Sequence, residues 1–116
     1  MYQSFEELEV WKRACNLAVV VYQTLRNCRD FSHRDQMQRA AVSIASNIAE
    51  GSERSPKDFA RFISVARGSS AELRTQAYIA AKIGTIDSKN MSSIVNETKE
   101  LSKMLFALAK SLTTEN

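Results

Sequence analysis

Apolar residues recur at alternating steps of three and four along most of the chain, and this spacing places them on one face of an α-helix. Short polar stretches divide the pattern into four segments, so we expect helices over residues 5–28, 33–50, 56–83 and 88–112. Four helices joined by short loops pack most simply as an antiparallel up-down-up-down bundle. The pattern therefore predicts an all-α protein in which residues 1–116 form a single four-helix bundle domain.

A single apolar seam in each of the last three segments is predicted to face the core. The seam residues are Met37, Ala41, Ile44, Ile48, Phe59, Ile63, Ala66, Ser70, Leu73, Ala77, Ala80, Met91, Ile94, Thr98, Leu101, Leu105, Leu108 and Leu112. The chain has only three Gly and one Pro, whereas a sheet protein of 116 residues would need many turns. Composition thus argues against an all-β fold.

Capping residues set the expected helix starts. Ser4 followed three residues later by Glu7 is a capping-box pattern, in which each side chain bonds the other residue's free backbone amide. The second helix is expected to begin at Ser32, the third at Ser55 and the fourth near Asp87 or Ser88, because short polar side chains accept hydrogen bonds from the first free amides of a helix.

The three glycines are assigned two roles. Gly51 and Gly84 follow apolar segments and are interpreted as C-terminal caps, since glycine adopts the left-handed conformation without steric cost. Gly68 lies inside the third segment among small residues, where glycine weakens a helix by about 1 kcal/mol relative to alanine. We expect Gly68 to mark the close approach of another backbone.

The first segment carries two apolar stripes. Its heptad seam is predicted to face the core and consists of Leu8, Trp11, Cys15, Ala18, Tyr22 and Leu25. Val10, Leu17 and Val21 lie about 110° from the centre of that seam on a helical wheel. A wide core stripe would account for these three residues, but contiguous exposed apolar surface usually has a partner. We therefore expect Val10, Leu17 and Val21 to form the interface of a homo-oligomer.

The second segment carries a polar stripe beside its apolar seam, within an arc of about 60°. The stripe consists of Gln36, Arg39, Ser43, Asn47 and Glu50, and Glu72 of the third segment is a candidate partner for Arg39. Short uncharged groups between one Arg and one Glu favour a hydrogen-bond network that fixes helix register or a subunit contact. A binding surface for a ligand or nucleic acid is the alternative interpretation.

Sixteen Lys and Arg stand against thirteen Asp and Glu, giving a net charge of +3. All of this excess lies in residues 34–82, which hold eight basic and five acidic side chains. Arginine pairs well with phosphate because its planar fork donates two parallel hydrogen bonds. The candidate phosphate contacts are Arg39, Arg54, Lys57, Arg61, Arg67 and Arg74. A solvated helix face with scattered charges is the alternative.

Catalytic and metal-binding patterns are missing from the sequence. His33 is the only histidine, and Cys15 and Cys28 are the only cysteines, too few for a zinc site or a disulfide framework. The scattered glycines build no phosphate-binding loop. We therefore expect no enzyme activity, no metal and no cofactor. The longest strongly apolar run, residues 17–22, is too short for a membrane span, and no secretory signal is visible, so a cytoplasmic protein without a membrane partner is expected.

Residues 5–12, 36–51 and 59–73 together form a specific pattern, most clearly in the run Ser43-Ile44-Ala45-Ser46-Asn47-Ile48-Ala49-Glu50-Gly51. The pattern resembles the bacterial four-helix-bundle proteins encoded by intervening sequences within 23S ribosomal RNA genes. It is also similar to the accessory variability protein of diversity-generating retroelements. The resemblance implies an antiparallel bundle that assembles as a ring of five. The retroelement relative implies a positively charged surface that binds nucleic acid and a reverse transcriptase.

These observations lead to two functional hypotheses. The first is a non-enzymatic homo-oligomer, expected to be a pentamer, whose repeated basic residues contact the backbone of structured RNA or DNA. Repetition of the basic residues in a ring would multiply the positive field, and each neutralised phosphate adds to a salt-sensitive affinity. The second is an assembly scaffold or adaptor for another protein, such as a polymerase, with little nucleic-acid affinity of its own.

Overall fold

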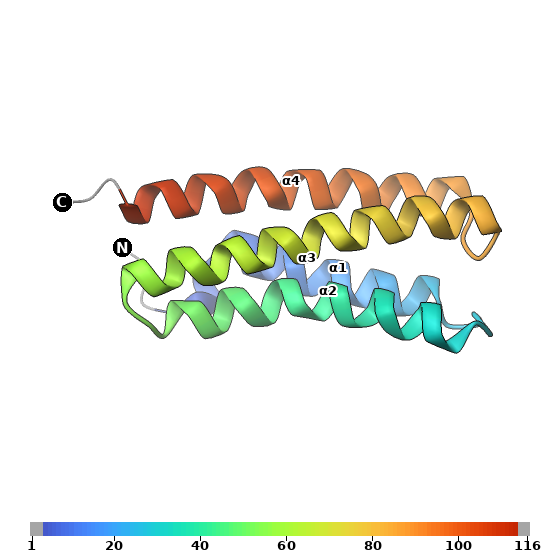
Figure 1. Ribbon diagram of the computed structural model, residues 1–116, viewed down its shortest axis with the longest axis horizontal. Helices are drawn as coiled ribbons and strands as arrows, with labels where there is room; N and C mark the ends of the chain where they lie inside the picture. The colour runs from blue at the N-terminus through green and yellow to red at the C-terminus, as the bar shows by residue number, and fades with distance from the viewer. Residues whose placement is uncertain (1–3, 114–116) are drawn as a thin grey trace.

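The computed structural model describes residues 4–113, and four long helices account for most of them (Figure 1). Helix α1 spans Glu9–Thr24, α2 spans Phe31–Ser52, α3 spans Pro56–Ile83 and α4 spans Ser88–Thr113. Consecutive helices run in opposite directions in a bundle of 49 × 19 × 19 Å, and residues 4–113 contain no strand. The prediction of an all-α protein with four helices is confirmed. No helix among these residues combines the length and apolar character needed to cross a membrane.

The helix starts follow the expected caps at α3 and α4. The side chains of Ser55 and Asp87 each accept a hydrogen bond from the backbone amide three residues further on, at 3.3 and 2.7 Å. Helix α2 begins earlier than expected, because Asp30 rather than Ser32 supplies the cap, accepting from the amide of the third following residue at 3.1 Å. Local side-chain chemistry therefore fixes these starts to within two residues.

The first helix is shorter than the sequence pattern predicted. Ser4 caps a single 3-10 turn over Phe5–Glu7, where its hydroxyl oxygen accepts from the amide of Glu6 at 3.2 Å. Leu8 then takes an extended conformation, with φ −76° and ψ 124°, which separates this turn from α1. The expected helix over residues 5–28 is thus a short 3-10 turn followed by α1, which ends at Thr24.

One of the three glycines keeps its expected role and two do not. Gly84 ends α3 in the left-handed conformation, with φ 85°, which confirms its assignment as a cap. Gly51, however, lies inside α2 without a positive φ, and a Cβ atom there would come within 2.5 Å of the Cβ of Phe62 on α3. A Cβ at Gly68 would meet nothing within 4 Å. The close helix approach expected at Gly68 therefore occurs at Gly51 within this chain.

The core lies along the bundle axis and is built from the seams predicted for α2, α3 and α4. Buried seam residues are Met37, Ala41, Ile44, Ile48, Phe59, Ile63, Ala66, Ser70, Leu73, Ala77, Ala80, Ile94, Thr98, Leu101 and Leu105. Met91, Leu108 and Leu112 pack against this core while half-buried. The helical spacing of the apolar residues thus correctly predicted the core-facing side of α2, α3 and α4.

Helix α1 buries the stripe that the sequence pattern had assigned to the outside. Val10, Leu17 and Val21 are only 5%, 3% and 0% exposed within the single chain, whereas Tyr22 of the predicted seam is 48% exposed. The prediction that Val10, Leu17 and Val21 form a subunit interface is therefore wrong. Together with Ala14 they form a purely aliphatic stripe. Tyrosine and tryptophan carry a polar atom that needs a partner when buried, so Trp11 and Tyr22 stay at the boundary with water, whereas Leu25 of the predicted seam is fully buried.

A group of polar side chains joins α3 to α4 near the middle of both helices. Ser70 donates to the backbone carbonyl of Thr98 at 2.9 Å, and Ser102 donates to the hydroxyl of Ser70 at 3.3 Å. The guanidinium of Arg74 donates to the hydroxyls of Thr98 and Ser102, both at 3.1 Å, and to the Thr98 carbonyl at 3.3 Å. We call these four residues the α3–α4 polar cluster.

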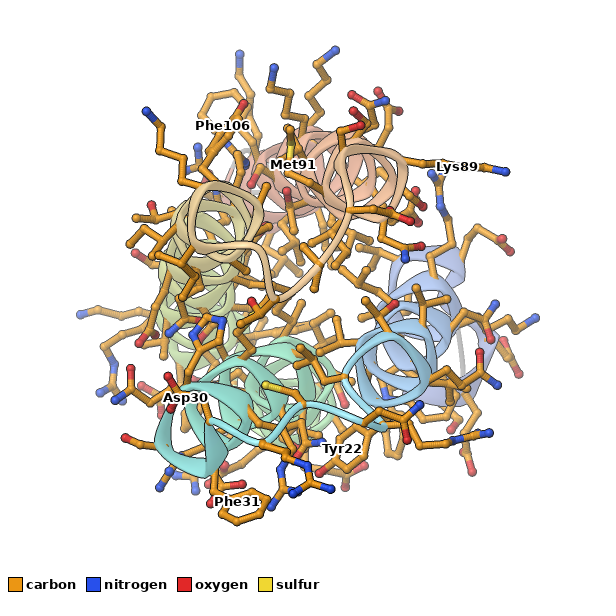
Figure 2. The ribbon with its side chains drawn as sticks, turned by 90° about the vertical axis from the view of Figure 1, so that its right-hand side faces the viewer. Tyr22, Asp30, Phe31, Lys89, Met91 and Phe106 are labelled. Carbon is orange, nitrogen blue, oxygen red and sulfur yellow. The ribbon has the colours of Figure 1, made fainter. Side chains whose placement is uncertain are left out.

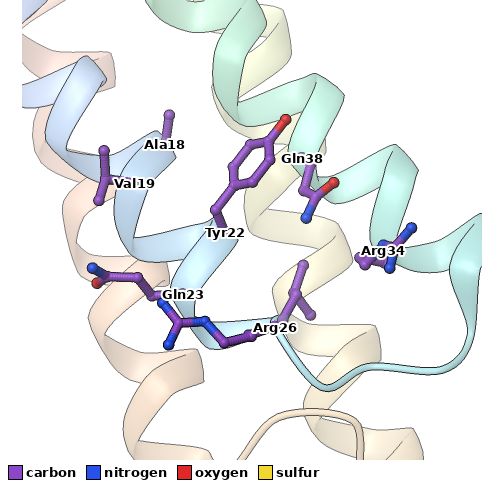
Figure 3. A pocket seen from close by; sticks show the side chains of 8 residues that line it. Ala18, Val19, Tyr22, Gln23, Arg26, Arg34 and Gln38 are labelled. Atoms are coloured by element: carbon purple, nitrogen blue, oxygen red, sulfur yellow. The ribbon is translucent and has the colours of Figure 1, made fainter.

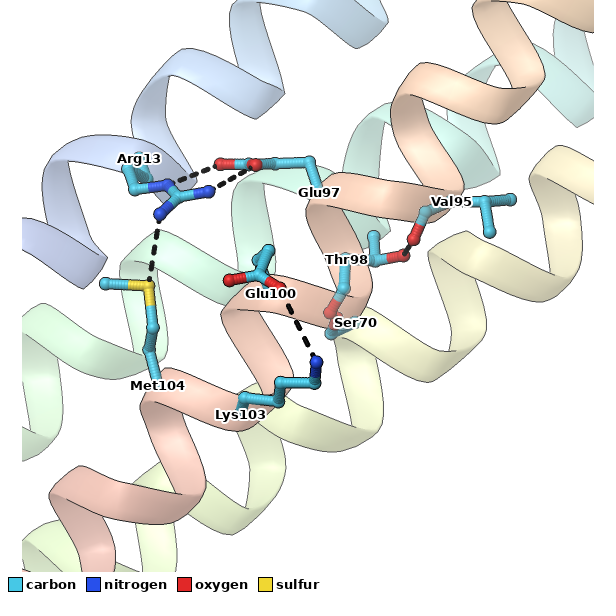
Figure 4. Close-up of polar contacts among 8 residues, drawn as sticks. All are labelled: Arg13, Ser70, Val95, Glu97, Thr98, Glu100, Lys103 and Met104. Atoms are coloured by element: carbon cyan, nitrogen blue, oxygen red, sulfur yellow. Dashed lines mark hydrogen bonds and ion pairs between the residues drawn. The ribbon is translucent and has the colours of Figure 1, made fainter.

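An ion pair closes the boundary between α1 and α4 (Figure 4). Arg13 donates through Nε and Nη2 to the two carboxylate oxygens of Glu97, at 2.8 and 2.7 Å. This hydrogen bonding raises the pKa of the Arg13 guanidinium above its ordinary value. Both side chains remain about one-third exposed, so water screens the pair and its contribution to stability is on the order of 1 kcal/mol or less.

Candidate nucleic-acid interface and assembly face

The predicted basic residues at the start of α3 share their surface with an equal number of acids. Basic Arg54, Lys57 and Arg61 lie in the same turn region as acidic Glu50, Glu53 and Asp58. Arg54 is 3.5 Å from Glu50 and Arg61 is 3.0 Å from Asp58, and all four side chains are exposed or half-exposed. Three positive and three negative charges cancel, so this turn carries no excess positive field.

Arg74 belongs to the interior boundary between α3 and α4 rather than to a continuous basic strip. Its Nε and one terminal nitrogen are engaged by Thr98 and Ser102, as described for the α3–α4 polar cluster. A guanidinium held in this way stabilises helix packing. The prediction that Arg74 is one of a row of phosphate-binding side chains is therefore replaced by a role in packing α3 against α4.

The polar stripe of α2 is only partly connected. The hydroxyls of Ser43 and Ser69 are 2.9 Å apart, which links α2 to α3, and Asn47 donates to the Ser43 hydroxyl at 2.9 Å. Arg39 and Glu72 line a small cavity of about 180 Å³ between the two helices, together with Gln36, Ala40 and Ser43. Within residues 4–113 no hydrogen bond or ion pair joins Arg39 to Glu72. The cavity is thus lined by both signs of charge.

A different basic surface runs along the outer face of α4. Lys99, Lys103, Phe106 and Lys110 are spaced at i, i+4, i+7 and i+11, which places them within an arc of about 60° on the helix. All four residues are exposed. Seen along the bundle, Phe106 points away from the core on the outer side of α4, while Lys89 points to another side (Figure 2). Lys89 is therefore outside this row.

The acidic side chains of α4 lie off this row. Glu97 is turned toward α1, where it pairs with Arg13 (Figure 4). Glu100 reaches Lys103 at 3.6 Å, but the Lys103 side chain remains 77% exposed. Within residues 4–113 the positions of the row itself hold no acidic residue, and Glu100 borders the row beside Lys103.

Arg67 of α3 extends the lysine row across the helix boundary. Its guanidinium carbon lies over the ring of Phe106, 5.1 Å from the ring centroid, and both residues are exposed. We call the resulting surface the α4 basic strip. It consists of Lys99, Lys103, Phe106 and Lys110 on α4 with Arg67 on α3. Of the six basic residues proposed from the sequence, only Arg67 belongs to it.

Charge counting along the chain could not reveal this strip. Residues 83–116 hold four basic and four acidic side chains, so the segment has no net charge. The helical spacing of Lys99, Lys103 and Lys110 separates the signs in space, and a wheel of α4 alone would have shown it.

An apolar surface covers the outer side of α1 and α2. Val19, Tyr22 and Val42 are 55%, 48% and 41% exposed. Tyr22 lines two shallow grooves. One, of about 600 Å³, is shared with Ala18, Val19 and polar side chains such as Arg34 and Gln38 (Figure 3). The other is shared with Val42 and polar residues of α2. We call the surface formed by Ala18, Val19, Tyr22 and Val42 the α1–α2 face. It replaces Val10, Leu17 and Val21 as the exposed apolar part of α1.

Comparison with known proteins decides the family. The family model of the 23S rRNA-intervening sequence proteins matches residues 6–107. The chain belongs to this family. A similar solved structure is that of a protein of unknown function from the S23 ribosomal protein family of Bacteroides thetaiotaomicron, with a TM-score of 0.81 and 24% sequence identity over 87% of this chain and 98% of that one. Among curated proteins no match is found.

Membership in the 23S rRNA-intervening sequence protein family confirms the resemblance found in the sequence. The similarity to the Bacteroides structure supports the four-helix fold, and at 24% identity it extends no further than the fold.

Proposed function

We propose that this member of the family is a non-enzymatic, self-assembling bundle that binds nucleic acid through the α4 basic strip. One observation carries the proposal: among the described residues, three exposed lysines and an exposed arginine gather on one outer surface, with Glu100 paired to Lys103 at its edge. Lysine and arginine neutralise phosphates and release counterions, which is the main source of sequence-independent affinity for nucleic acids. Contacts of this kind position the backbone and read little sequence.

Reversing two charges of the strip tests the proposal. We expect the double substitution Lys99→Glu and Lys103→Glu to weaken binding to a ribosomal RNA fragment at least about tenfold, because two phosphate contacts become repulsive. The slope of log affinity against log salt concentration should fall by about 2. Fluorescence anisotropy titrations at two salt concentrations measure both quantities.

A matched control uses lysines outside the strip. Lys12→Glu with Lys57→Glu changes the net charge by the same amount, and both lysines are exposed on other helices. This control should bind almost as the unaltered protein does. Equal losses of affinity for the two double variants would show that only the net charge matters and that the strip is not the binding site. Absence of any binding at low salt would reject nucleic-acid binding altogether.

Self-assembly is supported by the α1–α2 face. Two neighbouring helices expose valine and tyrosine side chains side by side, and contiguous apolar surface of this kind usually has a partner. A second copy of the chain would bury these residues, and the ring of five implied by the family resemblance is the arrangement that we propose. Each added copy would bring another basic strip and raise the number of phosphates that one assembly contacts.

Tyr22 is the position at which the assembly is tested. We expect Tyr22→Asp to reduce the mass in solution toward that of one 13.0 kDa chain, because a carboxylate placed between the two grooves cannot be buried against another subunit without large cost. Since Tyr22 is 48% exposed, the helical content should not change. Light scattering gives the mass and circular dichroism gives the helicity. An unaltered mass, or a monomeric parent protein, would contradict the role of this face.

The alternative function is a protein scaffold or adaptor, for example for a polymerase, with little nucleic-acid affinity. The grooves beside Tyr22 favour this alternative, because their mixed lining of apolar and polar side chains could hold a segment of another protein. A parent protein that assembles but gives no anisotropy change with RNA or DNA at low salt would select the scaffold over the nucleic-acid-binding bundle.

A further inference from the structure

Phe106 is the feature of the α4 basic strip that phosphate binding leaves unexplained. Its side chain is 53% exposed on the outer face of α4, and it points away from the core (Figure 2). A phenylalanine left in water forgoes the favourable free energy that burial of its ring would give. A surface that served only to neutralise phosphates would gain more from a further lysine at this position.

The surroundings of Phe106 are those of a base-stacking platform. Lys103 and Lys110 lie one turn before and after it on the same face, and Arg67 lies against the ring at 5.1 Å. An exposed aromatic ring between cations is the arrangement by which proteins hold single strands: the ring stacks on a base while the cations follow the backbone. In a duplex the bases are stacked on each other and present only their edges, so the ring cannot reach a base face.

We infer that the α4 basic strip is selective for single-stranded nucleic acid, with a base stacked on Phe106 and the flanking phosphates held by Lys99, Lys103, Lys110 and Arg67. This inference rests on the proposed nucleic-acid-binding function and names its substrate class. Lys99 and Lys110 are about 16 Å apart along the helix axis, so the strip contacts a short run of nucleotides. Every base has a π-face that can stack on the Phe106 ring, so binding is expected to be independent of the nucleotide sequence.

The test replaces the ring while keeping its apolar character. Phe106→Leu should weaken binding to an unstructured RNA oligonucleotide about tenfold, the usual effect of losing one stacked base. The same variant should bind the annealed duplex, and a strand of the same length without bases, as the parent protein does. Phe106→Trp should restore the single-strand affinity, because the indole ring also stacks on a base.

Several results would overturn the inference while leaving the proposed function intact. One is a parent protein that binds duplex and single strand equally, with no effect of Phe106→Leu. Another is an equal loss on all three probes, which would make Phe106 a structural support of the strip. A change of mass in the Phe106→Leu variant, measured by light scattering, would assign Phe106 to the contact between subunits. Failure of every probe to bind at low salt would instead reject the proposed function itself.

Discussion

Leu17→Asp is expected to unfold the single chain rather than merely separate subunits. Leu17 is 3% exposed and lies in the aliphatic core stripe of α1. Truncating a buried leucine costs about 3 kcal/mol, and a carboxylate without a partner adds about 2 kcal/mol or more. The total of about 5 kcal/mol is comparable with the whole stability of a small domain, which is about 5–15 kcal/mol. Urea titration followed by circular dichroism measures the loss.

The pH dependence of this variant identifies the cause of the loss. Burial raises the pKa of a carboxyl group, so the native state of the variant binds a proton more readily than its unfolded state does. The variant should therefore regain part of its stability relative to the parent as the pH falls below neutrality. Asn16→Asp adds the same charge at an exposed position of the same helix and should change stability by less than about 0.5 kcal/mol. A folded Leu17→Asp protein with reduced mass would restore the interface interpretation.

Gly51→Ala and Gly68→Ala are expected to change stability in opposite directions. At Gly51 the new Cβ would come within 2.5 Å of the Cβ of Phe62, an atom that cannot move without the backbone of α3. Overpacking of this kind costs about 1–3 kcal/mol, and forcing α2 away from α3 also loosens the core around it. We expect a net destabilisation of about 2 kcal/mol, measured by thermal and urea unfolding.

The same substitution at Gly68 is the matched control. A Cβ there meets no atom within 4 Å, and the residue lies in the middle of α3 without a positive φ. Alanine lowers the backbone entropy of the unfolded chain and favours the helix, so Gly68→Ala should stabilise the protein by about 1 kcal/mol. Similar effects at the two positions would show that helix propensity dominates and that the contact between α2 and α3 is less tight than described.

Features that depend on neighbouring residues could be predicted from the sequence. Ser55, Asp87 and Gly84 act within one turn of their own positions, so their capping roles follow from local chemistry alone. The seams of α2, α3 and α4 were also predictable, because each helix has one apolar face. Family membership followed from the run that ends at Glu50-Gly51, although the physical role of Gly51 did not.

Features that depend on how helices face each other could not be predicted in the same way. Helix α1 has two apolar stripes, and the choice between them depends on which one fits against the other helices. The stripe with Trp11 and Tyr22 matched a heptad better, but only the aliphatic stripe through Leu17 has no polar atoms to satisfy. Likewise, the roles of Arg74 and Arg67 differ because of the α4 residue opposite each of them. Arg74 lies opposite Thr98, and Arg67 lies opposite Phe106.

The α3–α4 polar cluster fixes the axial register of α3 against α4. Heptad seams look alike after a shift of seven residues, so apolar packing alone would tolerate a slipped pairing. Such a slip would set Met91 or Leu105 opposite Arg74 in place of Thr98 and leave the guanidinium facing hydrocarbon. Polar groups that match in a single alignment exclude the slipped pairings. The distance between Arg67 and Phe106 is therefore set by contacts within the protein itself.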